Sequence, residues 1–247
     1  MTSKPPQREP SLAGQTVVVI GGSAGIGLET ARQARIEGAE VILTGRNPDR
    51  LDAAAAEIGA LRTAAFDAND SQALQQFFEA IPAPIDHVLV TAGGPRYGPL
   101  LEMDIADVRE ALSGHAVLGL EVARNARSKM RPGGTLLLMG GTGGRRIDHR
   151  LGIVSAATAT LPPFTAALAL ELAPLRVNLI AAGFVDTPLS ASLLGEQLDE
   201  RRNELQTTLP IRRVVTADDV AALAVHLMVN TALTGATYDI DGGQQFV

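Results

Sequence analysis

The chain has 247 residues, of which 46% are hydrophobic and 19% charged, a balance typical of a soluble globular protein of one domain. No run approaches the roughly 18 uninterrupted apolar residues that a membrane-spanning helix needs. The formal net charge of −6 gives no general attraction to nucleic acid or anionic lipid, and the absence of cysteine excludes disulfides, thiolate nucleophiles and zinc–thiolate sites. We therefore expect a cytoplasmic protein that binds neither nucleic acid nor membranes.

The N-terminal residues MTSKPPQREPS are polar and rich in proline, and they lack the apolar segment of a secretory signal. We expect a disordered tail over residues 1–11. No linker, repeat or low-complexity block interrupts the rest of the chain, so we expect a single domain over residues 12–247.

From residue 16 onward, short aliphatic runs alternate with longer, alanine-rich amphipathic segments. Continuous apolar runs are typical of strands buried on both faces of a parallel sheet. The expected strands are Thr16–Gly21, Glu40–Thr44, Leu61–Ala65, His87–Thr91, Thr135–Met139, Arg176–Ala181 and Ala236–Ile240. The expected helices lie near Ile26–Glu37, Pro48–Ile58, Ser71–Ala80, Asp104–Met130, Pro162–Ala173 and Thr216–Met228. This alternation predicts an α/β fold: a Rossmann-type, doubly wound parallel sheet of about seven strands with helices on both faces.

A glycine-rich turn, Ile20–Gly27 (IGGSAGIG), joins the first expected strand to the first expected helix. A pyrophosphate at a helix N-terminus needs free backbone N–H groups, a tight turn and no Cβ atom in the way. Gly21, Gly25 and Gly27 meet these needs, and the order strand, turn, helix favours a dinucleotide site over a glycine cluster that only caps a helix. The expected contacts in this turn are Gly21, Ser23, Ala24, Gly25, Ile26 and Gly27.

The end of the second expected strand predicts which dinucleotide is bound. An acidic residue there binds the ribose hydroxyls of NAD, whereas an arginine accommodates the 2′-phosphate of NADP. This chain has Arg46 followed by Asn47, with no acid beside them. A guanidinium offers a two-pronged donor to a phosphate, so we expect NADP(H) bound through Arg46 and Asn47. The alternative is a solvated loop arginine.

These motifs and their order resemble the short-chain dehydrogenase/reductase family from about Leu12 to Val247. The family's Thr-Gly-x-x-x-Gly-x-Gly turn corresponds to Ile20–Gly27, and the segments ELAPLRVN and YDIDGG are also similar. The resemblance implies further cofactor contacts after the third, fourth and sixth strands. They are Asp67 and Ala68 at the adenine position, Ala92 and Gly93 in VTAG, and Gly183, Val185 and Thr187 in AGFVDT, which would contact the nicotinamide carboxamide. The family's threonine, asparagine pair and proline in these motifs are replaced by Ile20, Val90-Thr91 and Ala182.

The resemblance also implies four catalytic positions. In the family a tyrosine transfers the proton, a lysine four residues later lowers the tyrosine pKa and holds the nicotinamide ribose, a serine polarises the carbonyl, and an asparagine holds a relay water. Counting back from LELAP places the tyrosine at Val154 and the lysine at Thr158. The serine position falls on Gly141 and the asparagine position on His115. No Tyr-x-x-x-Lys exists, because the lysines are Lys4 and Lys129 and the tyrosines are Tyr97 and Tyr238.

A pair of prolines, Pro162-Pro163, lies inside the helix that would carry the tyrosine. A mid-helix proline costs roughly 3 kcal/mol, whereas proline in a first helical turn is tolerated. We therefore expect the regular helix to begin near Thr160–Pro162, and residues 140–160 to form a remodelled loop over the nicotinamide end.

Several polar residues could replace the missing catalytic groups. Thr142 is the hydroxyl nearest the serine position, and His115 has a suitable intrinsic pKa; the alternatives are a turn threonine and a buried structural histidine. Tyr97 could be a pocket wall or a stray acid. The run Arg145, Arg146, Asp148, His149 and Arg150 could be a solvated face or could recognise an anionic substrate. His115 and His149 lack metal-ligand spacing with any nearby acid, so we expect no metal site.

Two hypotheses from different classes follow. The first is an NADP(H)-dependent oxidoreductase acting on a carbonyl or alcohol substrate with an atypical active site. The second is a catalytically silent NADP(H)-binding sensor or partner subunit, and a non-redox lyase or isomerase is a weaker third. The family resemblance implies a homodimer or homotetramer, although Pro162-Pro163 lies in a helix that usually forms its interface.

Overall fold

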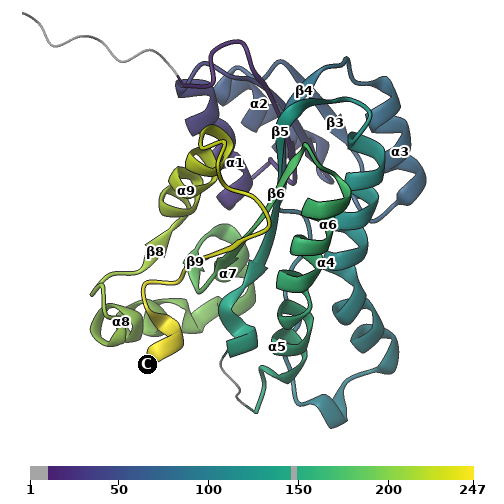
Figure 1. The fold of residues 1–247 in the computed structure, drawn as a ribbon. Helices are drawn as coiled ribbons and strands as arrows, with labels where there is room; N and C mark the ends of the chain where they lie inside the picture. Colours follow the sequence, from purple (N-terminus) through teal and green to yellow (C-terminus); the bar gives the residue numbers. More distant parts are fainter. Residues whose placement is uncertain (1–10, 146–148) are drawn as a thin grey trace, which may run out of the picture.

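The central sheet of the computed structural model has seven parallel strands in the order β3-β2-β1-β4-β5-β6-β9 (Figure 1). The structure describes residues 11–145 and 149–247. The strands are β1 (Thr16–Ile20), β2 (Glu40–Gly45), β3 (Arg62–Ala65), β4 (Ile85–Val90), β5 (Met130–Gly141), β6 (Arg176–Ala182) and β9 (Thr237–Ile240). The strand order runs outward from β1 in both directions, which confirms the Rossmann-type sheet and places a crevice at the carboxyl ends of β1 and β4.

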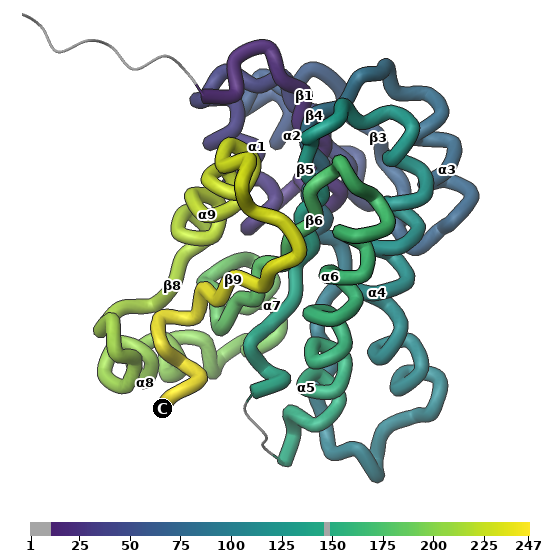
Figure 2. Tube along the Cα trace, viewed as in Figure 1, coloured from purple at the N-terminus to yellow at the C-terminus, as the bar shows by residue number. Residues whose placement is uncertain are grey.

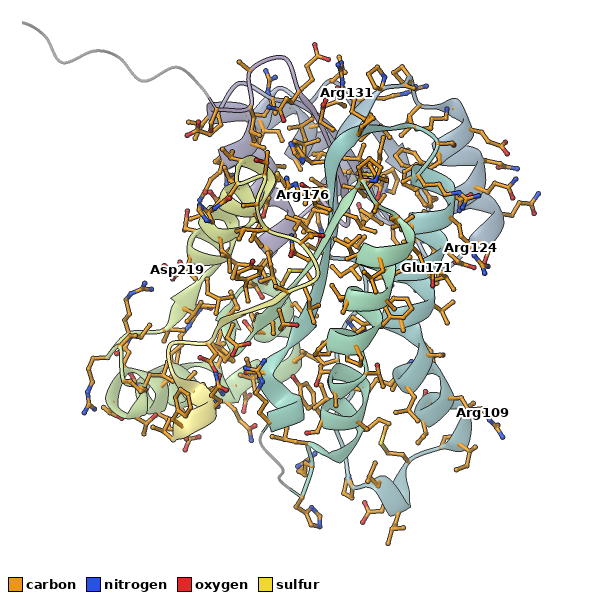
Figure 3. All side chains as sticks on the ribbon, in the orientation of Figure 1. Arg109, Arg124, Arg131, Glu171, Arg176 and Asp219 are labelled. Carbon is orange, nitrogen blue, oxygen red and sulfur yellow. The ribbon has the colours of Figure 1, made fainter. Side chains whose placement is uncertain are left out.

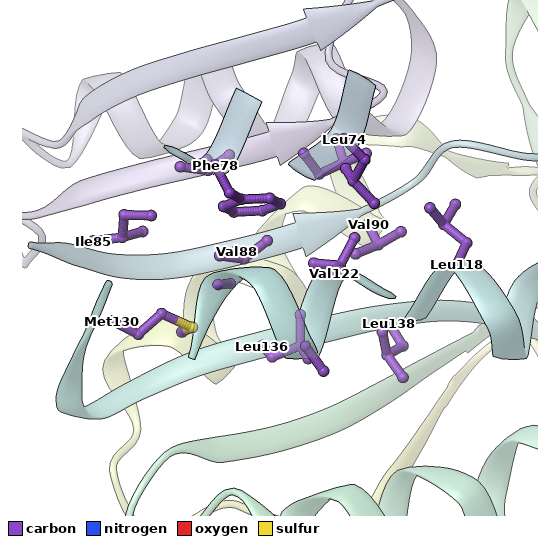
Figure 4. Close-up of a cluster of buried hydrophobic side chains, with 14 of the residues drawn as sticks. Leu74, Phe78, Ile85, Val88, Val90, Leu118, Val122, Met130, Leu136 and Leu138 are labelled. Atoms are coloured by element: carbon purple, nitrogen blue, oxygen red, sulfur yellow. The ribbon is translucent and has the colours of Figure 1, made fainter. Parts of the chain in front are cut away.

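Helices cover both faces of the sheet (Figures 1 and 2). They are α1 (Gly25–Ile36), α2 (Pro48–Ile58), α3 (Ser71–Ala80), α4 (Ile105–Ala126), α5 (Gly152–Ala159), α6 (Leu161–Glu171), α7 (Pro188–Leu194), α8 (Leu198–Thr208) and α9 (Ala217–Val229). One buried cluster joins α1, α2 and α9 to the sheet, and a second joins α3, α4 and α6 to its other face. Figure 4 shows this second cluster, in which Phe78 of α3 and Val122 of α4 meet the strand residues Val88 and Leu136. Burial of these apolar faces supplies the main driving force for the three-layer arrangement.

The segment before Pro162 differs from the expected loop. Residues Thr142–Arg145 form a short 3-10 turn, η2, and α5 is helical over Gly152–Ala159, so the expectation of a loop through residue 160 is wrong there. The helical run is interrupted at Thr160, and α6 begins at Leu161, as the prolines predicted. The break is inexpensive because Pro162 and Pro163 occupy the first turn of α6, where backbone N–H groups have no intrahelical acceptor.

The helices α7 and α8 and the two-residue strands β7 (Val185–Asp186) and β8 (Val215–Thr216) were not expected from the sequence. β7 and β8 pair with each other in parallel, outside the main sheet. They carry the chain from the end of β6 into α7 and from α8 into α9. This excursion lies beside the carboxyl end of the sheet (Figure 1).

A buried arginine ties the base of β6 to the end of α9. Arg176 is only 5% exposed and donates hydrogen bonds to five backbone oxygens, at 2.7–3.2 Å (Figure 3). The acceptors are the carbonyls of Gly133, Leu227, Met228, Asn230 and Leu233. The guanidinium thus satisfies carbonyl groups that the end of a helix leaves without partners.

The run Gly152–Glu171 is long and apolar enough, by length and composition alone, to cross a membrane, with a mean hydropathy of 1.5. It comprises α5 and α6 and is interrupted at Thr160. Leu161 and Leu168 of α6 pack into the core beside α4, and core helices of this composition pass the same length test.

Candidate cofactor and active site

The glycine turn after β1 has no room for side chains at two of its positions. A Cβ atom on Gly21 would lie 2.7 Å from the Ala92 backbone nitrogen, and one on Gly27 would lie 2.2 Å from the Gly21 carbonyl oxygen. Gly21 and Gly25 also have φ angles of +101° and +55°, in the region that favours glycine. The sequence therefore needs glycine here to bring the backbone of the turn against the start of α1.

Two threonines hold this turn in place. Thr44, at the end of β2, accepts a hydrogen bond from the Gly21 backbone N–H through its hydroxyl at 3.3 Å, and its carbonyl accepts from Gly22 at 2.8 Å. Thr91, just after β4, donates its hydroxyl to the Gly21 carbonyl oxygen at 2.9 Å. Sequence reasoning noted Thr91 only as a departure from the family's asparagine and did not foresee this contact. The turn is thus bonded to both strands that flank β1.

The adenosine side of the crevice brings together the ends of β2 and β3. Arg46 is exposed, one residue after Gly45, whose Cβ position is 3.0 Å from the Ser23 hydroxyl of the glycine turn. The Asn47 side chain instead caps α2 by accepting from the Arg50 backbone N–H at 2.9 Å. Gly45 thus brings the end of β2 against the turn, and a role for the Arg46 that follows it stays a prediction.

Beyond the end of β3, Asp67 is exposed and accepts from the Asn69 backbone N–H at 3.0 Å, while Ala68 is buried in the core. Asp67 also lines a hollow of about 350 Å³ between α3 and α4. The rest of its lining is Asn69, Ser71, Glu110, Ser113, Gly114, Val117, Leu118 and Glu121.

On the nicotinamide side, the segment after β6 reaches back to the glycine turn. Thr187 caps α7 by accepting from the Ser190 backbone N–H at 3.3 Å, and its Cβ lies 3.5 Å from the Cβ position of Gly25. Val185 is held in β7 by its pairing with β8. The Gly183 N–H donates to the Ile240 carbonyl at 3.2 Å. Thr187 is thus brought against Gly25 of the glycine turn, whereas Gly183 and Val185 are bonded to β9 and β8.

His115 of α4 lies beside Ala92 and Gly93, in the turn that follows β4. Its Nε2 is 3.5 Å from the Cβ position of Gly93, whose φ is +106°. Burial lowers the pKa of His115 below its ordinary value of 6.5, so the ring is mainly neutral at pH 7. The structure thus brings the proposed catalytic histidine to the carboxyl end of β4, at the crevice.

The positions expected for serine, tyrosine and lysine also lie together, where α5 packs against η2. Val154 Cγ1 and Thr158 Oγ1 are each 3.8 Å from the Cβ position of Gly143, and Thr158 Cγ2 is 3.4 Å from that of Gly141. The Thr158 hydroxyl donates to the Val154 carbonyl at 2.8 Å. Thr142 is only 6% exposed at the start of η2. This side of the crevice therefore presents mostly methyl groups and glycine backbone.

Tyr97 and the basic run occupy the rim rather than the centre. Tyr97 is 49% exposed, and desolvation raises the pKa of its hydroxyl while the Arg201 guanidinium opposes this shift. Arg145 forms an ion pair with Asp239 of β9 and donates to Gln245 at 3.1 Å, so its charge is directed to the C-terminal segment. His149 is exposed, and Arg146 and Asp148 lie outside the described residues. Among residues 11–145 and 149–247, no cluster of three His, Asp or Glu side chains could hold a metal ion.

A family model described as enoyl-(acyl carrier protein) reductase matches residues 21–245, nearly the whole chain. The chain belongs to the short-chain dehydrogenase/reductase family. The members of this family act as oxidoreductases on small carbonyl or alcohol compounds.

Relatives resemble this short-chain dehydrogenase/reductase over nearly their full length. A short-chain dehydrogenase/reductase of Stachybotrys chlorohalonatus is 29% identical, covering 95% of this chain and 98% of the relative. A 3-oxoacyl-(acyl-carrier-protein) reductase of Bos taurus is 31% identical over 92% of this chain and 96% of its own. A small-chain dehydrogenase crystallised with NADPH is similar in structure with a TM-score of 0.81, at 26% identity, covering 94% of this chain and 99% of that one.

Proposed function

We propose that this chain is an NADP(H)-dependent oxidoreductase that acts on a carbonyl or alcohol substrate, with atypical proton-handling groups. The observation that carries the proposal is the glycine turn, where Cβ atoms at Gly21 and Gly27 would collide with backbone and where α1 begins. A pyrophosphate would bind to the backbone N–H groups at the start of α1. The residues proposed to hold the cofactor are Gly21, Ser23, Ala24, Gly25, Ile26, Gly27, Arg46, Asn47, Asp67, Ala68, Ala92, Gly93, Gly183, Val185 and Thr187.

The preference for NADP(H) rests on Arg46. Arg46 is exposed and follows Gly45, which packs against Ser23 of the glycine turn, and no acid lies next to it in sequence. A 2′-phosphate would gain charge-assisted hydrogen bonds there, whereas the ribose hydroxyls of NAD would gain little. The NADPH complex of the similar small-chain dehydrogenase supports the same choice.

We propose His115 and Thr142 as the catalytic side chains. When bound, the nicotinamide supplies or accepts the hydride. Thr142 would donate its hydroxyl to the substrate oxygen, and the neutral His115 ring would pass a proton between that oxygen and water through its N–H group. Loss of a tuned acid–base group typically slows a reaction 10²–10⁴-fold, so we expect slow turnover of ordinary ketones.

A catalytically silent NADP(H)-binding protein is the second candidate. It is favoured by α5, where Val154 presents a methyl group and the Thr158 hydroxyl is bonded to the Val154 carbonyl. Neither group can protonate a substrate oxygen.

Titration of the purified protein with NADPH and NADH tests the cofactor, and turnover of a panel of ketones, aldehydes and alcohols separates the two candidates. We expect NADPH to bind more tightly than NADH and at least one carbonyl to be reduced. His115→Phe should lower kcat while leaving the NADPH dissociation constant unchanged. Failure of both nucleotides to bind at millimolar concentration would refute both candidates.

We further propose that the protein is cytoplasmic and forms a homodimer or homotetramer. The neighbouring helices α4 and α6 expose apolar side chains: Leu112 and Val117 are 41% and 48% exposed, and Leu170 is 82% exposed. Sedimentation velocity tests this assembly, because a monomer at micromolar concentration would contradict it.

A further inference from the structure

The C-terminal residues Asp239–Gln245, which we call the C-terminal clamp, contact the segment after β6. The Gln244 side-chain carbonyl accepts a hydrogen bond from the Phe184 backbone N–H at 2.7 Å. A Cβ atom on the neighbouring Gly183 would lie 2.6 Å from both Asp241 Cβ and Gln244 Oε1. Gly183 and Phe184 are therefore packed directly on the C-terminal clamp.

The clamp has an internal structure that fixes the Gln244 side chain. Asp241 is only 5% exposed, and its two carboxylate oxygens accept from the Gly243 and Gln245 backbone N–H groups at 2.8 and 3.1 Å. Gly242 and Gly243 have φ angles of +65° and +85° and turn the chain between these contacts. The turn holds Gln244 at one position against the segment after β6.

The same clamp contacts η2 on the other side of the crevice. Asp239 and Gln245 both bind Arg145, which ends the turn that starts at Thr142. The clamp therefore touches both segments that border the nicotinamide side: 183–187 through Gln244, and 142–145 through Asp239 and Gln245. Figure 2 shows the C-terminal segment running on from β9 and ending beside α8.

We propose that Gln244 is a positioning residue for the nicotinamide half of the cofactor, acting through the Phe184 peptide. The inference rests on the proposed function, because it assigns Gly183–Thr187 to the nicotinamide end. Within residues 11–145 and 149–247, the hydrogen bonds of the Gly183 and Phe184 N–H groups go to the Ile240 carbonyl and to Gln244, both from the C-terminal part of the chain. With Gln244 truncated, the Phe184 peptide is free to rotate, and the backbone that would meet the carboxamide loses its fixed orientation.

Two probes separate this role from a general loss of binding. NADPH spans the whole crevice, whereas 2′,5′-ADP carries only the adenosine half and does not reach residues 183–187. We expect Gln244→Ala to weaken NADPH binding roughly three- to tenfold, the range for loss of one hydrogen bond, and to leave 2′,5′-ADP binding unchanged. Calorimetric titration of the apoprotein measures both dissociation constants without turnover.

Matched variants complete the test. Gln244→Glu retains an oxygen acceptor and should bind NADPH as the wild type does. Gln75→Ala removes the same type of side chain from the exposed face of α3, outside the clamp, and should also bind NADPH as the wild type does. Equal NADPH binding by Gln244→Ala and the wild type would overturn the inference. So would a parallel loss of NADPH and 2′,5′-ADP affinity, which would indicate general unfolding. If the wild type binds neither probe, the proposed function itself fails.

Discussion

The Thr91 hydroxyl lies between two glycines of the cofactor turn, 2.8 Å and 2.7 Å from the Cβ positions of Gly21 and Gly27, and it donates to the Gly21 carbonyl at 2.9 Å. This single hydroxyl both fills the space that side chains would need and bonds the turn to β4. The geometry of the turn thus depends on a residue seventy positions away in the chain.

We predict that Thr91→Val weakens both folding and nucleotide binding. The methyl group cannot donate to Gly21 and needs more room than a hydroxyl at 2.9 Å, so the free energy of unfolding should fall by about 1 kcal/mol. Thr91→Ser keeps the donor and should remain close to the wild type in denaturant unfolding and in NADPH affinity. Equal behaviour of the two variants would show that the hydroxyl has no such role.

Arg46 should select the phosphate of NADP. We predict that Arg46→Ala weakens NADPH binding by roughly 10- to 100-fold, as expected for the loss of charged hydrogen bonds, while NADH binding changes little. Arg50→Ala, an exposed arginine one turn into α2, is the matched control for the loss of one positive charge. A similar loss of NADPH affinity in the Arg50 variant would show that long-range electrostatics, and not a specific contact of Arg46, causes the effect.

We predict that the folded protein loses stability in acid because His87 is buried. Its Nε2 bonds to the Gln15 side-chain oxygen at 2.6 Å, and burial together with the nearby Arg176 charge lowers its pKa from 6.5 to about 3. Between these pH values the unfolded chain binds a proton at His87 and the folded protein does not, so stability falls as pH drops below 6.5. One such group changes the free energy of unfolding by up to about 1.4 kcal/mol per pH unit.

Urea unfolding between pH 4 and pH 7 measures this effect. His87→Gln can still hydrogen-bond to Gln15 but does not titrate, so its stability should depend less steeply on pH than that of the wild type. Parallel curves for the two proteins would place the acid sensitivity in other groups.

Substitution by alanine should change the free energy of unfolding differently at two glycines of α4. A Cβ on Gly114 meets nothing within 4 Å, so Gly114→Ala should stabilise the apoprotein by about 0.5–1 kcal/mol through helix propensity. A Cβ on Gly119 would lie 3.3 Å from Leu138 Cδ2 and 3.6 Å from Phe164 Cε1, where α4 packs on β5 and α6. We expect Gly119→Ala to be less stable than Gly114→Ala by about 1 kcal/mol or more in thermal unfolding. Equal stabilisation by the two substitutions would mean that Leu138 and Phe164 move to accommodate the new methyl group at position 119 without loss of stability.

Local patterns predicted the sheet. The apolar runs and the glycine turn determine strand positions within a few residues, because burial on both faces and a tight turn are requirements of the local chain. Gly45 and Ser23 come together because each lies at the carboxyl end of a neighbouring strand, whereas the roles predicted for Ser23 and Arg46 in binding the cofactor stay predictions.

The rest of the site depends on contacts that spacing does not encode. Pro162-Pro163 correctly predicted the start of α6, but the prolines say nothing about α5, which ends before them. α8 has a polar sequence, LDERRNELQTT, without a strong apolar periodicity, so tertiary packing rather than pattern makes it helical. Gln244 bonds Phe184 across sixty residues, and although Phe184 lies within AGFVDT, nothing in that motif indicates Gln244 as its partner.

The position of the C-terminal clamp has a practical consequence for engineering this protein. A substitution or insertion within residues 239–245, made for labelling or solubility, would act on the backbone of Gly183 and Phe184, to which the clamp is packed and hydrogen-bonded. A change in nucleotide affinity after such an edit would then arise some sixty residues away from the edited position, so each edited version should be compared with the native sequence in nucleotide binding before it is used.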